Sequence, residues 1–507
     1  MDRGKSLIKI LWTAALLVAG CSGPGRVALE LGFARQAQTS SSGLPAGVLS
    51  LKVEVRRGTL EGEVLEDSGC LVVGEKQHQQ LVLDLGPGQG LVLVVKAWDS
   101  PDCTPASQPP WLGVSLRMDI IEGREITVPV FVTRRGWRKN FARQEFTSPL
   151  AFASATRLND GRVLVAGGFE SIEQAAEGWR LVAGNRAWLY HPGSGRLEAV
   201  GRLSESRAAH RAFVLSDGRV VLAGGAREML LRYQPANRFQ LIEQGSPAGV
   251  DIFDPQSGRF QLSYIPRDLE RTDAAWVADG SDRIYALGGR TTLARSDQVW
   301  RGEPVSNYFQ WTLQNQRLNF ARRGAQALVM DDVLLIAGGA LAGQSGLEAA
   351  GLSDLVFEPV AGTEDYAGLI GATFHSVGPD EAWLCGGISA EGLVEPVRFV
   401  LQLRREQDGF SLQLGKLIQA RAYHQARFTA RGLVLAGGVG EGFAWQKDLE
   451  MQAPGDSEFL FEDQLSCASL GMALAELEEG SLLLAGGLGL DGSGQPLLCP
   501  TLEIFSP

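Results

Sequence analysis

Three of the five histidines, His210, His375 and His424, recur ahead of a glycine pair, and His424 follows a tyrosine, Tyr423. Histidine is the commonest metal ligand and a frequent acid or base, so these residues are the first candidates for chemistry. They stand 14, 11 and 13 residues before their Gly-Gly doublets, which makes them recurrences of one position in a repeat. We therefore expect them on different structural units, hydrogen-bonded to neighbouring backbone, and we expect no metal and no cofactor.

Motifs for other kinds of catalysis are missing from the sequence. It contains no Cys-x-x-Cys, His-Glu-x-x-His, Gly-x-Ser-x-Gly or Walker motif. Ser216-Asp217-Gly218 and the loop from Asp491 to Gly494 are typical of short polar turns. No catalytic residue is predicted, and a binding protein is favoured over an enzyme.

Two long loops offer the best candidates for binding. They follow Gly168 and Gly225 and produce spacings of 57 and 64 residues between doublets, whereas the other spacings are 48 to 51. Loops this long are often functional, and loops on a rigid scaffold concentrate binding residues. The other interpretation is a solvated insertion without a ligand, which chains tolerate at little entropic cost. The candidate binding face comprises Trp179, Arg180, Arg227, Arg232 and Tyr233, together with His210, Arg421, Tyr423 and His424.

Seven Gly-Gly doublets divide the chain into a repeat. Each doublet closes an apolar run such as Leu164-Val165-Ala166, and a hairpin turn such as Asn159-Asp160-Gly161 often precedes the run. A period near 50 residues that contains strands predicts a β-propeller in which each repeat is one four-stranded blade. The doublets are Gly167-Gly168, Gly224-Gly225, Gly288-Gly289, Gly338-Gly339, Gly386-Gly387, Gly437-Gly438 and Gly486-Gly487.

Paired glycines, a downstream strand that ends in an aromatic and a proline, as in Tyr190-His191-Pro192, and the Arg-x-x-His openings at Arg207 and Arg421 together resemble the kelch repeat family. The resemblance covers residues 141–507 and implies an all-β, seven-bladed kelch-like β-propeller. That family includes copper radical oxidases similar to galactose oxidase, and Tyr423-His424 resembles their Tyr-His pair. Their chemistry also needs a second histidine from beyond the propeller, a second tyrosine and a cysteine cross-linked to it, so the match is incomplete. An oxidase or a carbohydrate-active enzyme with its site at the central channel stays the alternative.

The ring is expected to close through its amino-terminal segment. The last repeat ends at Pro507, directly after its third strand, so its outer edge would be unpaired. Proteins avoid such edges. We predict that a strand at about residues 142–148 pairs with Thr501 to Phe505 and joins the two ends.

The first 47 residues predict export and membrane anchoring. Basic residues precede an apolar run from Ile10 to Ala19, which is typical of a signal peptide, assigned here to residues 1–20. Val18-Ala19-Gly20-Cys21 resembles the bacterial lipobox, which implies lipid on Cys21; the other interpretation is an ordinary signal peptide. Residues 21–47 have linker composition and predict a tether. The expected location is the bacterial cell envelope, lipid-anchored at the outer membrane, with the periplasmic or surface side left open.

A small β module is expected at residues 48–135, between the tether and the propeller. Alternating apolar residues predict five or six strands in this stretch, which favours an immunoglobulin-like or prealbumin-like sandwich. Cys70 and Cys103 are placed to form a disulfide there, and Cys467 and Cys499 are placed to form a second in the last blade. Cys385 is expected to be a buried thiol.

The charge balance excludes one class of partner. With 58 acidic and 47 basic residues the net charge is −11, and no basic stripe is present, so nucleic-acid binding is not expected. The sequence thus predicts a monomeric, membrane-anchored, non-catalytic scaffold that binds an envelope or extracellular protein, or a glycan.

Overall fold

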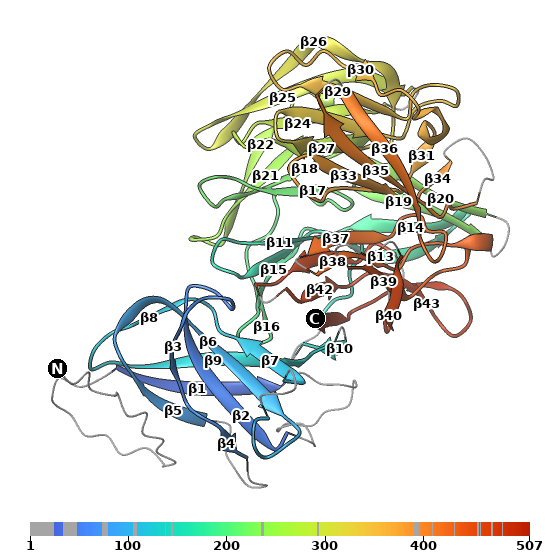
Figure 1. The fold of residues 1–507 in the computed structure, drawn as a ribbon. Helices are drawn as coiled ribbons and strands as arrows, with labels where there is room; N and C mark the ends of the chain where they lie inside the picture. Colours follow the sequence, from blue (N-terminus) through green and yellow to red (C-terminus); the bar gives the residue numbers. More distant parts are fainter. Residues whose placement is uncertain are drawn as a thin grey trace.

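The protein is an all-β chain with two regions, a small module and a larger ring of sheets (Figure 1). The predicted signal peptide and Cys21 lie outside the part that is described. No described helix is long and apolar enough to cross a bilayer. The computed structural model describes residues 25–33, 48–73, 80–104, 109–136, 138–142, 146–234, 238–291, 294–389, 395–407, 409–429, 431–453, 456, 458–467, 470–478 and 480–506.

The small module is one nine-stranded sheet, not the two separate sheets of a sandwich. Its main path runs β3-β2-β6-β7-β9-β1-β5, while β4 pairs with β2 and β8 with β6. The sheet curls, because Val53 of β2 and Leu85 of β5 share one buried cluster although they lie near opposite ends of the path. The strands are β1 (Gly25–Phe33), β2 (Ser50–Arg57), β3 (Val64–Asp67), β4 (Leu71–Val72), β5 (Gln80–Leu85), β6 (Gly88–Trp98), β7 (Trp111–Val114), β8 (Met118–Ile120) and β9 (Glu125–Arg134).

Strand β1 corrects the prediction of a continuous tether at residues 21–47. It lies between β9, to which it is parallel, and β5, to which it is antiparallel. Val27 and Leu29 are fully buried, so their alternation is that of a strand. This alternation is short and stands beside a Ser- and Gly-rich stretch, which is why composition alone concealed it.

The larger region contains seven consecutive four-stranded sheets, called ring sheets 1 to 7. Sheet 1 comprises β11 (Ser154–Arg157), β12 (Val163–Ala166), β15 (Ala187–His191) and β16 (Arg196–Ala199). Sheet 2 comprises β17 (Arg211–Val214), β18 (Val220–Ala223), β21 (Gly249–Asp254) and β22 (Arg259–Tyr264). Sheet 3 comprises β23 (Thr272–Ala278), β24 (Ile284–Arg290), β25 (Ser296–Val305) and β26 (Tyr308–Arg322). Sheet 4 comprises β27 (Gln326–Met330), β28 (Val333–Ala337), β29 (Leu347–Gly351) and β30 (Glu358–Pro359). Sheet 5 comprises β32 (Thr373–Ser376), β33 (Glu381–Cys385), β35 (Phe399–Glu406) and β36 (Gly409–Lys416). Sheet 6 comprises β37 (Gln425–Thr429), β38 (Gly432–Ala436), β39 (Asp448–Gln452) and β40 (Leu460–Gln464). Sheet 7 comprises β41 (Ala473–Glu476), β42 (Leu482–Ala485), β45 (Leu502–Ser506) and β10 (Arg138–Phe141).

The first strands of these sheets form a closed cycle. β11, β17, β23, β27, β32, β37 and β41 contact one another in that order, and β41 contacts β11. The second strands are covered on both faces by neighbouring sheets, which explains their continuous apolar runs. The glycine doublets follow these strands, except in ring sheet 3, where Gly288 and Gly289 lie inside β24. Backbones crowd at the doublets: a Cβ on Gly386, whose φ is +60°, would lie 2.3 Å from the Arg421 carbonyl oxygen.

Closure of the ring uses a strand next to the predicted one. β10 pairs antiparallel with β45, from Arg138 opposite Ser506 to Phe141 opposite Glu503, so the predicted boundary at residues 142–148 is wrong. Phe146, inside the predicted segment, instead packs in the core of ring sheets 1 and 7 and donates its N–H to the Pro500 carbonyl. β10 also joins the module to the ring, because Asn140 accepts a hydrogen bond from the Arg134 N–H at 2.9 Å.

The two long loops predicted above ring sheets 1 and 2 fold as an additional sheet, called the inserted sheet. It contains β13 (Phe169–Ala175), β14 (Gly178–Ala183), β19 (Glu228–Gln234) and β20 (Arg238–Gln244), in that order. β14 and β19 come from different insertions and pair with each other. The insertions therefore complete one structure that neither could form alone.

Two disulfides and one free thiol are present among the described residues. Cys70 is bonded to Cys103 with a Cα–Cα distance of 5.7 Å, and Cys467 to Cys499 at 6.0 Å. Cys385 is buried and free, and burial raises the pKa of its thiol. A neutral, enclosed thiol is unreactive.

Candidate functional site

A cavity of about 1160 Å³ runs through the middle of the ring. All seven first strands line it, and residues of β19 and β20 cover part of one end. Side chains on central strands are held more precisely than side chains on loops, so this cavity is a rigid site. One lining residue from each ring sheet is Ser154, Arg211, Ala275, Gln326, Thr373, Gln425 and Ala473.

A ring of seven residues with left-handed backbone surrounds the end of the cavity below the inserted sheet. Six of them lie shortly before a first strand and Asp273 is the second residue of β23; their φ angles are between 55° and 65°. Glycine adopts this conformation freely, whereas other residues are strained by it. Phe152, Asp273 and Tyr423 thus hold large side chains where ring sheets 4, 5 and 7 have glycine. The seven residues are Phe152, Ala209, Asp273, Gly324, Gly371, Tyr423 and Gly471.

Backbone hydrogen bonds join neighbouring residues of this ring, and at Asp273 a side-chain carboxyl group takes the place of the backbone acceptor. Ala209 donates its N–H to the Phe152 carbonyl at 2.8 Å, and Gly324 donates to the Asp273 carbonyl at 2.7 Å. The N–H of Asp273 instead donates to Oε2 of Glu243 at 3.0 Å. Glu243 belongs to β20, so the inserted sheet is tied to the ring by a carboxyl group at the cavity.

Glu243 and Asp273 form a buried acid pair. Loss of water and the negative charge of Asp273 raise the pKa of Glu243 to about 8. Burial also raises the pKa of Asp273, and this effect is opposed by Arg290, whose Nε lies 3.2 Å from Asp273 Oδ2, and by Arg323. At neutral pH Glu243 therefore keeps its proton and can donate it. A carboxyl group with such a pKa in a cavity is a candidate general acid.

Aromatic side chains hold the other side of the inserted sheet. Phe239 of β20 lies 5.5 Å from the Tyr423 ring and 6.4 Å from the Trp445 ring, centre to centre. Tyr233 of β19 meets Trp445 at 5.3 Å, edge to face. Burial raises the pKa of Tyr423 above its usual range, with a smaller contribution from the charge of Asp273. The Tyr423 phenol is therefore protonated at neutral pH.

Two of the three histidines, His210 and His424, occupy one repeat position as predicted, whereas His375 does not, and their partners are side-chain hydroxyls and not the predicted backbone. His210 and His424 each precede a first strand, and each bonds a hydroxyl of the preceding sheet, Ser154 Oγ and Thr373 Oγ1, at 2.9 Å. His375 lies inside β32, opposite Trp383, and Nε2 of its ring has no hydrogen-bond partner among the described residues. All three line the one cavity, so they are closer together than expected.

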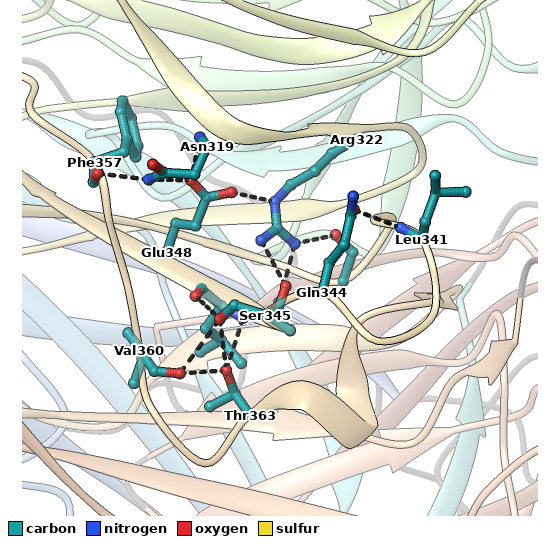
Figure 2. Close-up of polar contacts among 12 residues, drawn as sticks. Asn319, Arg322, Leu341, Gln344, Ser345, Glu348, Phe357, Val360 and Thr363 are labelled. Carbon is teal, nitrogen blue, oxygen red and sulfur yellow. Dashed lines mark hydrogen bonds and ion pairs between the residues drawn. The ribbon is translucent and has the colours of Figure 1, made fainter.

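Arg421 is removed from the candidate binding face because it is completely buried. Its guanidinium bonds Glu450 of β39 at 2.6 Å and the Gly437 carbonyl at 2.6 Å. Arg322 has the same role: its Nε donates to Glu348 Oε1 at 2.8 Å and its other nitrogens donate to backbone carbonyls. Figure 2 shows these contacts. These arginines hold the first strand, the glycine doublet and the third strand of one sheet together.

The remaining predicted residues are divided between cavity and outer surface. Arg232 lines the cavity and pairs with Glu177. Tyr233 stands in the aromatic contact with Trp445. Arg180 forms an exposed ion pair with Glu173 at 2.9 Å, and Arg227 pairs with the half-buried Glu205 at 2.8 Å. Trp179 is half-buried on β14 beside Arg180.

The donors at the cavity do not fit a copper radical site. His210 and His424 are already bonded to hydroxyls, and Cys385, the last residue of β33, is a free thiol buried in the core. Within the described residues, no three His, Cys, Asp or Glu side chains gather around a common point. We derive no redox step from this site.

Comparison with known proteins identifies the fold and nothing finer. No protein-family profile and no curated protein matches the sequence. Solved structures do match. A fungal alcohol oxidase of the AA5 family, determined in complex with copper, aligns over 72% of this chain and 75% of its own, with a TM-score of 0.53 and 14% identity. The architecture is therefore similar to the galactose oxidase-like fold of that protein.

Several residues of the cavity were not predicted from the sequence, namely Glu243, Asp273, Arg323 and Phe239. Glu243 and Phe239 come from the inserted sheet, Asp273 from ring sheet 3 and Arg323 from the segment between ring sheets 3 and 4, so no local spacing brings them together. One signal was available. The position of Asp273 is glycine in ring sheets 4, 5 and 7, so a non-glycine residue there is unusual for the repeat.

Proposed function

We propose that this chain is a seven-bladed kelch-like β-propeller that binds a glycan or an extended protein segment in its central cavity, beneath the inserted sheet. The carrying observation is the cavity of about 1160 Å³, lined by all seven first strands and by polar and aromatic side chains. This volume is in the range of, or slightly above, that of small-molecule sites. Aromatic faces beside polar groups suit sugar rings and extended peptides alike.

Binding is favoured over redox chemistry because the histidine and cysteine side chains that could hold a metal are already engaged or enclosed. The two histidines before first strands are occupied by hydroxyls, and the free cysteine is in the core. The strained residues Phe152, Asp273 and Tyr423 instead keep their side chains at the cavity entrance. Strain of this kind is retained where function requires it.

The proposed setting is the bacterial envelope, with the protein anchored through lipid on Cys21. The lipobox-like sequence ending at Cys21 supports the anchor, and the two disulfides fit an oxidising compartment. Incorporation of labelled palmitate, lost in Cys21→Ser, tests the anchor separately from the binding function.

A cavity-filling variant tests where the ligand binds. Gln425 lines the cavity from β37, and Gln425→Trp fills part of it without changing the outer surface. Glycan arrays and pull-downs from the native envelope should lose their signal with Gln425→Trp and keep it with Arg180→Ala. Loss with Arg180→Ala alone would place the ligand on the outer face of the inserted sheet. No retained glycan or protein with the native chain would refute a binding function.

A carbohydrate-active enzyme is the second candidate, favoured by the pKa of about 8 for Glu243 beside Asp273. A protonated carboxyl next to a second carboxylate is the group that cleavage of a glycosidic bond requires. Incubation with oligosaccharides and mass spectrometry of the products tests this. New reducing ends that disappear with Glu243→Gln would establish the enzyme, and unchanged sugars would exclude it for those substrates.

A further inference from the structure

The lining of the cavity has the opposite charge to the rest of the molecule. The whole chain carries a net charge of −11. The cavity is lined by five arginines but by only two acids, Glu243 and Asp273. Glu243 is mostly protonated at neutral pH because its pKa is raised to about 8. The lining arginines are Arg211, Arg232, Arg290, Arg323 and Arg427.

Carboxylates neutralise only some of these arginines. Arg232 pairs with Glu177, and Arg290 pairs with Asp273. Arg427 has one distant partner, Glu476, at 3.9 Å. Arg211 bonds only the neutral side-chain amide of Gln326, and no described carboxylate lies within ion-pair distance of Arg211 or Arg323. Arg211 and Arg323 therefore have no ion pair with a described carboxylate, although the charge of Arg323 acts on Asp273 from farther away.

Three of the lining residues form an inner cluster on first strands: Arg211 of β17, His375 of β32 and Arg427 of β37. The positive charges of both arginines act on His375, and together with burial they lower its pKa to about 3. His375 is therefore neutral, and no described residue forms a hydrogen bond with its Nε2. The Arg427 side chain is 52% exposed, so a ligand can reach its guanidinium.

We propose that the inner cluster binds an oxyanion, a carboxylate or a sulfate, on a saccharide held in the cavity. The inference deepens the proposed binding function and rests on it. Guanidinium groups present paired N–H donors that match the two oxygens of a carboxylate or sulfate. The ligand supplies the negative charge that the protein does not, and the space of about 1160 Å³ accommodates a short oligosaccharide.

Calorimetry of the full chain with matched probes tests the inference. The probes are trigalacturonate, its methyl ester, and a galactose trisaccharide with a 6-sulfate. The acidic probes should bind, and the methyl ester should bind at least about 10-fold more weakly because charge-assisted hydrogen bonds are lost. Arg211→Gln/Arg427→Gln should weaken acidic binding about 10- to 100-fold, whereas Arg259→Gln, an exposed control on β22, should leave it unchanged. Preference for the carboxylate or for the sulfate probe distinguishes the two sources of charge.

A simple ion provides a second test that does not depend on the choice of sugar. At constant ionic strength, sulfate in place of chloride should raise the Tm of the native chain more than that of the double variant. Equal shifts, or equal affinity for trigalacturonate and its ester, would overturn the oxyanion inference. A neutral glycan that binds the native chain and the double variant alike would leave the proposed function intact and refute the charge requirement. Absence of any glycan or protein ligand for the native chain would instead refute the proposed function.

Discussion

Arg322 and Arg211 lie in the same ring and have opposite electrostatic surroundings. Arg322 is fully buried, and a buried carboxylate, Glu348, compensates its charge (Figure 2). Arg211 faces the cavity and bonds only an amide. The two arginines look alike in the sequence, because each is a basic residue near the start of a first strand. The difference teaches that the position of the partner carboxylate, not the arginine itself, separates a structural arginine from one available to a ligand.

Three sheets share the structural arrangement. Arg207 pairs with Asp251, Arg322 with Glu348 and Arg421 with Glu450, and all six side chains are completely buried. Each acid also accepts a backbone N–H from the segment before its arginine, as Glu348 does from Asn319 at 2.6 Å. One acid therefore fixes both the arginine and the incoming chain of its sheet.

The largest effect is expected on removal of a structural acid. Glu348→Gln leaves the Arg322 guanidinium buried without its counter-charge, which costs about 3–5 kcal/mol of unfolding free energy. Urea denaturation measures this loss. Glu173→Gln, which breaks the exposed pair with Arg180, serves as the matched control and should leave the midpoint unchanged. Similar losses in the two variants would contradict the distinction.

Replacement of Glu243 should change stability in a pH-dependent way, and unlike replacement of Glu348 it should become more favourable as pH rises. Its pKa is about 8 in the folded chain and near the ordinary 4.5 when unfolded, so the folded state binds the extra proton. That contribution to stability is complete below about pH 4.5 and is lost as pH rises toward 8. Glu243→Gln has no proton to lose, so its Tm relative to the native chain should rise from pH 5 to pH 9. A difference that is constant with pH would show that Glu243 titrates normally.

Ring sheet 7 has the buried structural acid of the other three sheets without the partner arginine. Glu503 occupies the place of the structural acids on β45 and accepts the Ser466 N–H at 3.2 Å. The sequence has Ser469 where the other three sheets have arginine. Burial accordingly raises the pKa of Glu503, whereas no arginine stabilises its charged form.

Glu503→Gln should therefore stabilise the protein at pH 8, in contrast to Glu348→Gln. A raised pKa means that the contribution of Glu503 is full at acid pH and lost as pH rises through its folded pKa. Thermal melts at pH 5 and pH 8 check the sign. Destabilisation at both pH values would mean that the charged carboxylate itself is needed in this sheet.

The sequence predicted the repeat more completely than the site. Doublets and apolar runs depend on burial within one sheet, which leaves a local pattern. The role of Arg421 was not predictable, because its partner Glu450 is 29 residues away on the third strand. The Glu243–Asp273 pair joins β20 of the inserted sheet to β23 of ring sheet 3, and the strand at Gly25–Phe33 pairs with a parallel partner 99 residues later. Such contacts leave no periodic signal.

The smallest effect on stability is expected at the cavity itself. Arg211→Gln removes a charge that no described carboxylate balances and that lies close enough to Arg427 for both to act on His375. The change in unfolding free energy should be within about 0.5 kcal/mol, because no charge is left without its partner. Urea denaturation beside Glu348→Gln measures the contrast directly. A loss as large as that of Glu348→Gln would show that Arg211 holds the ring together, and the separation between structural arginines and ligand-binding arginines would then fail.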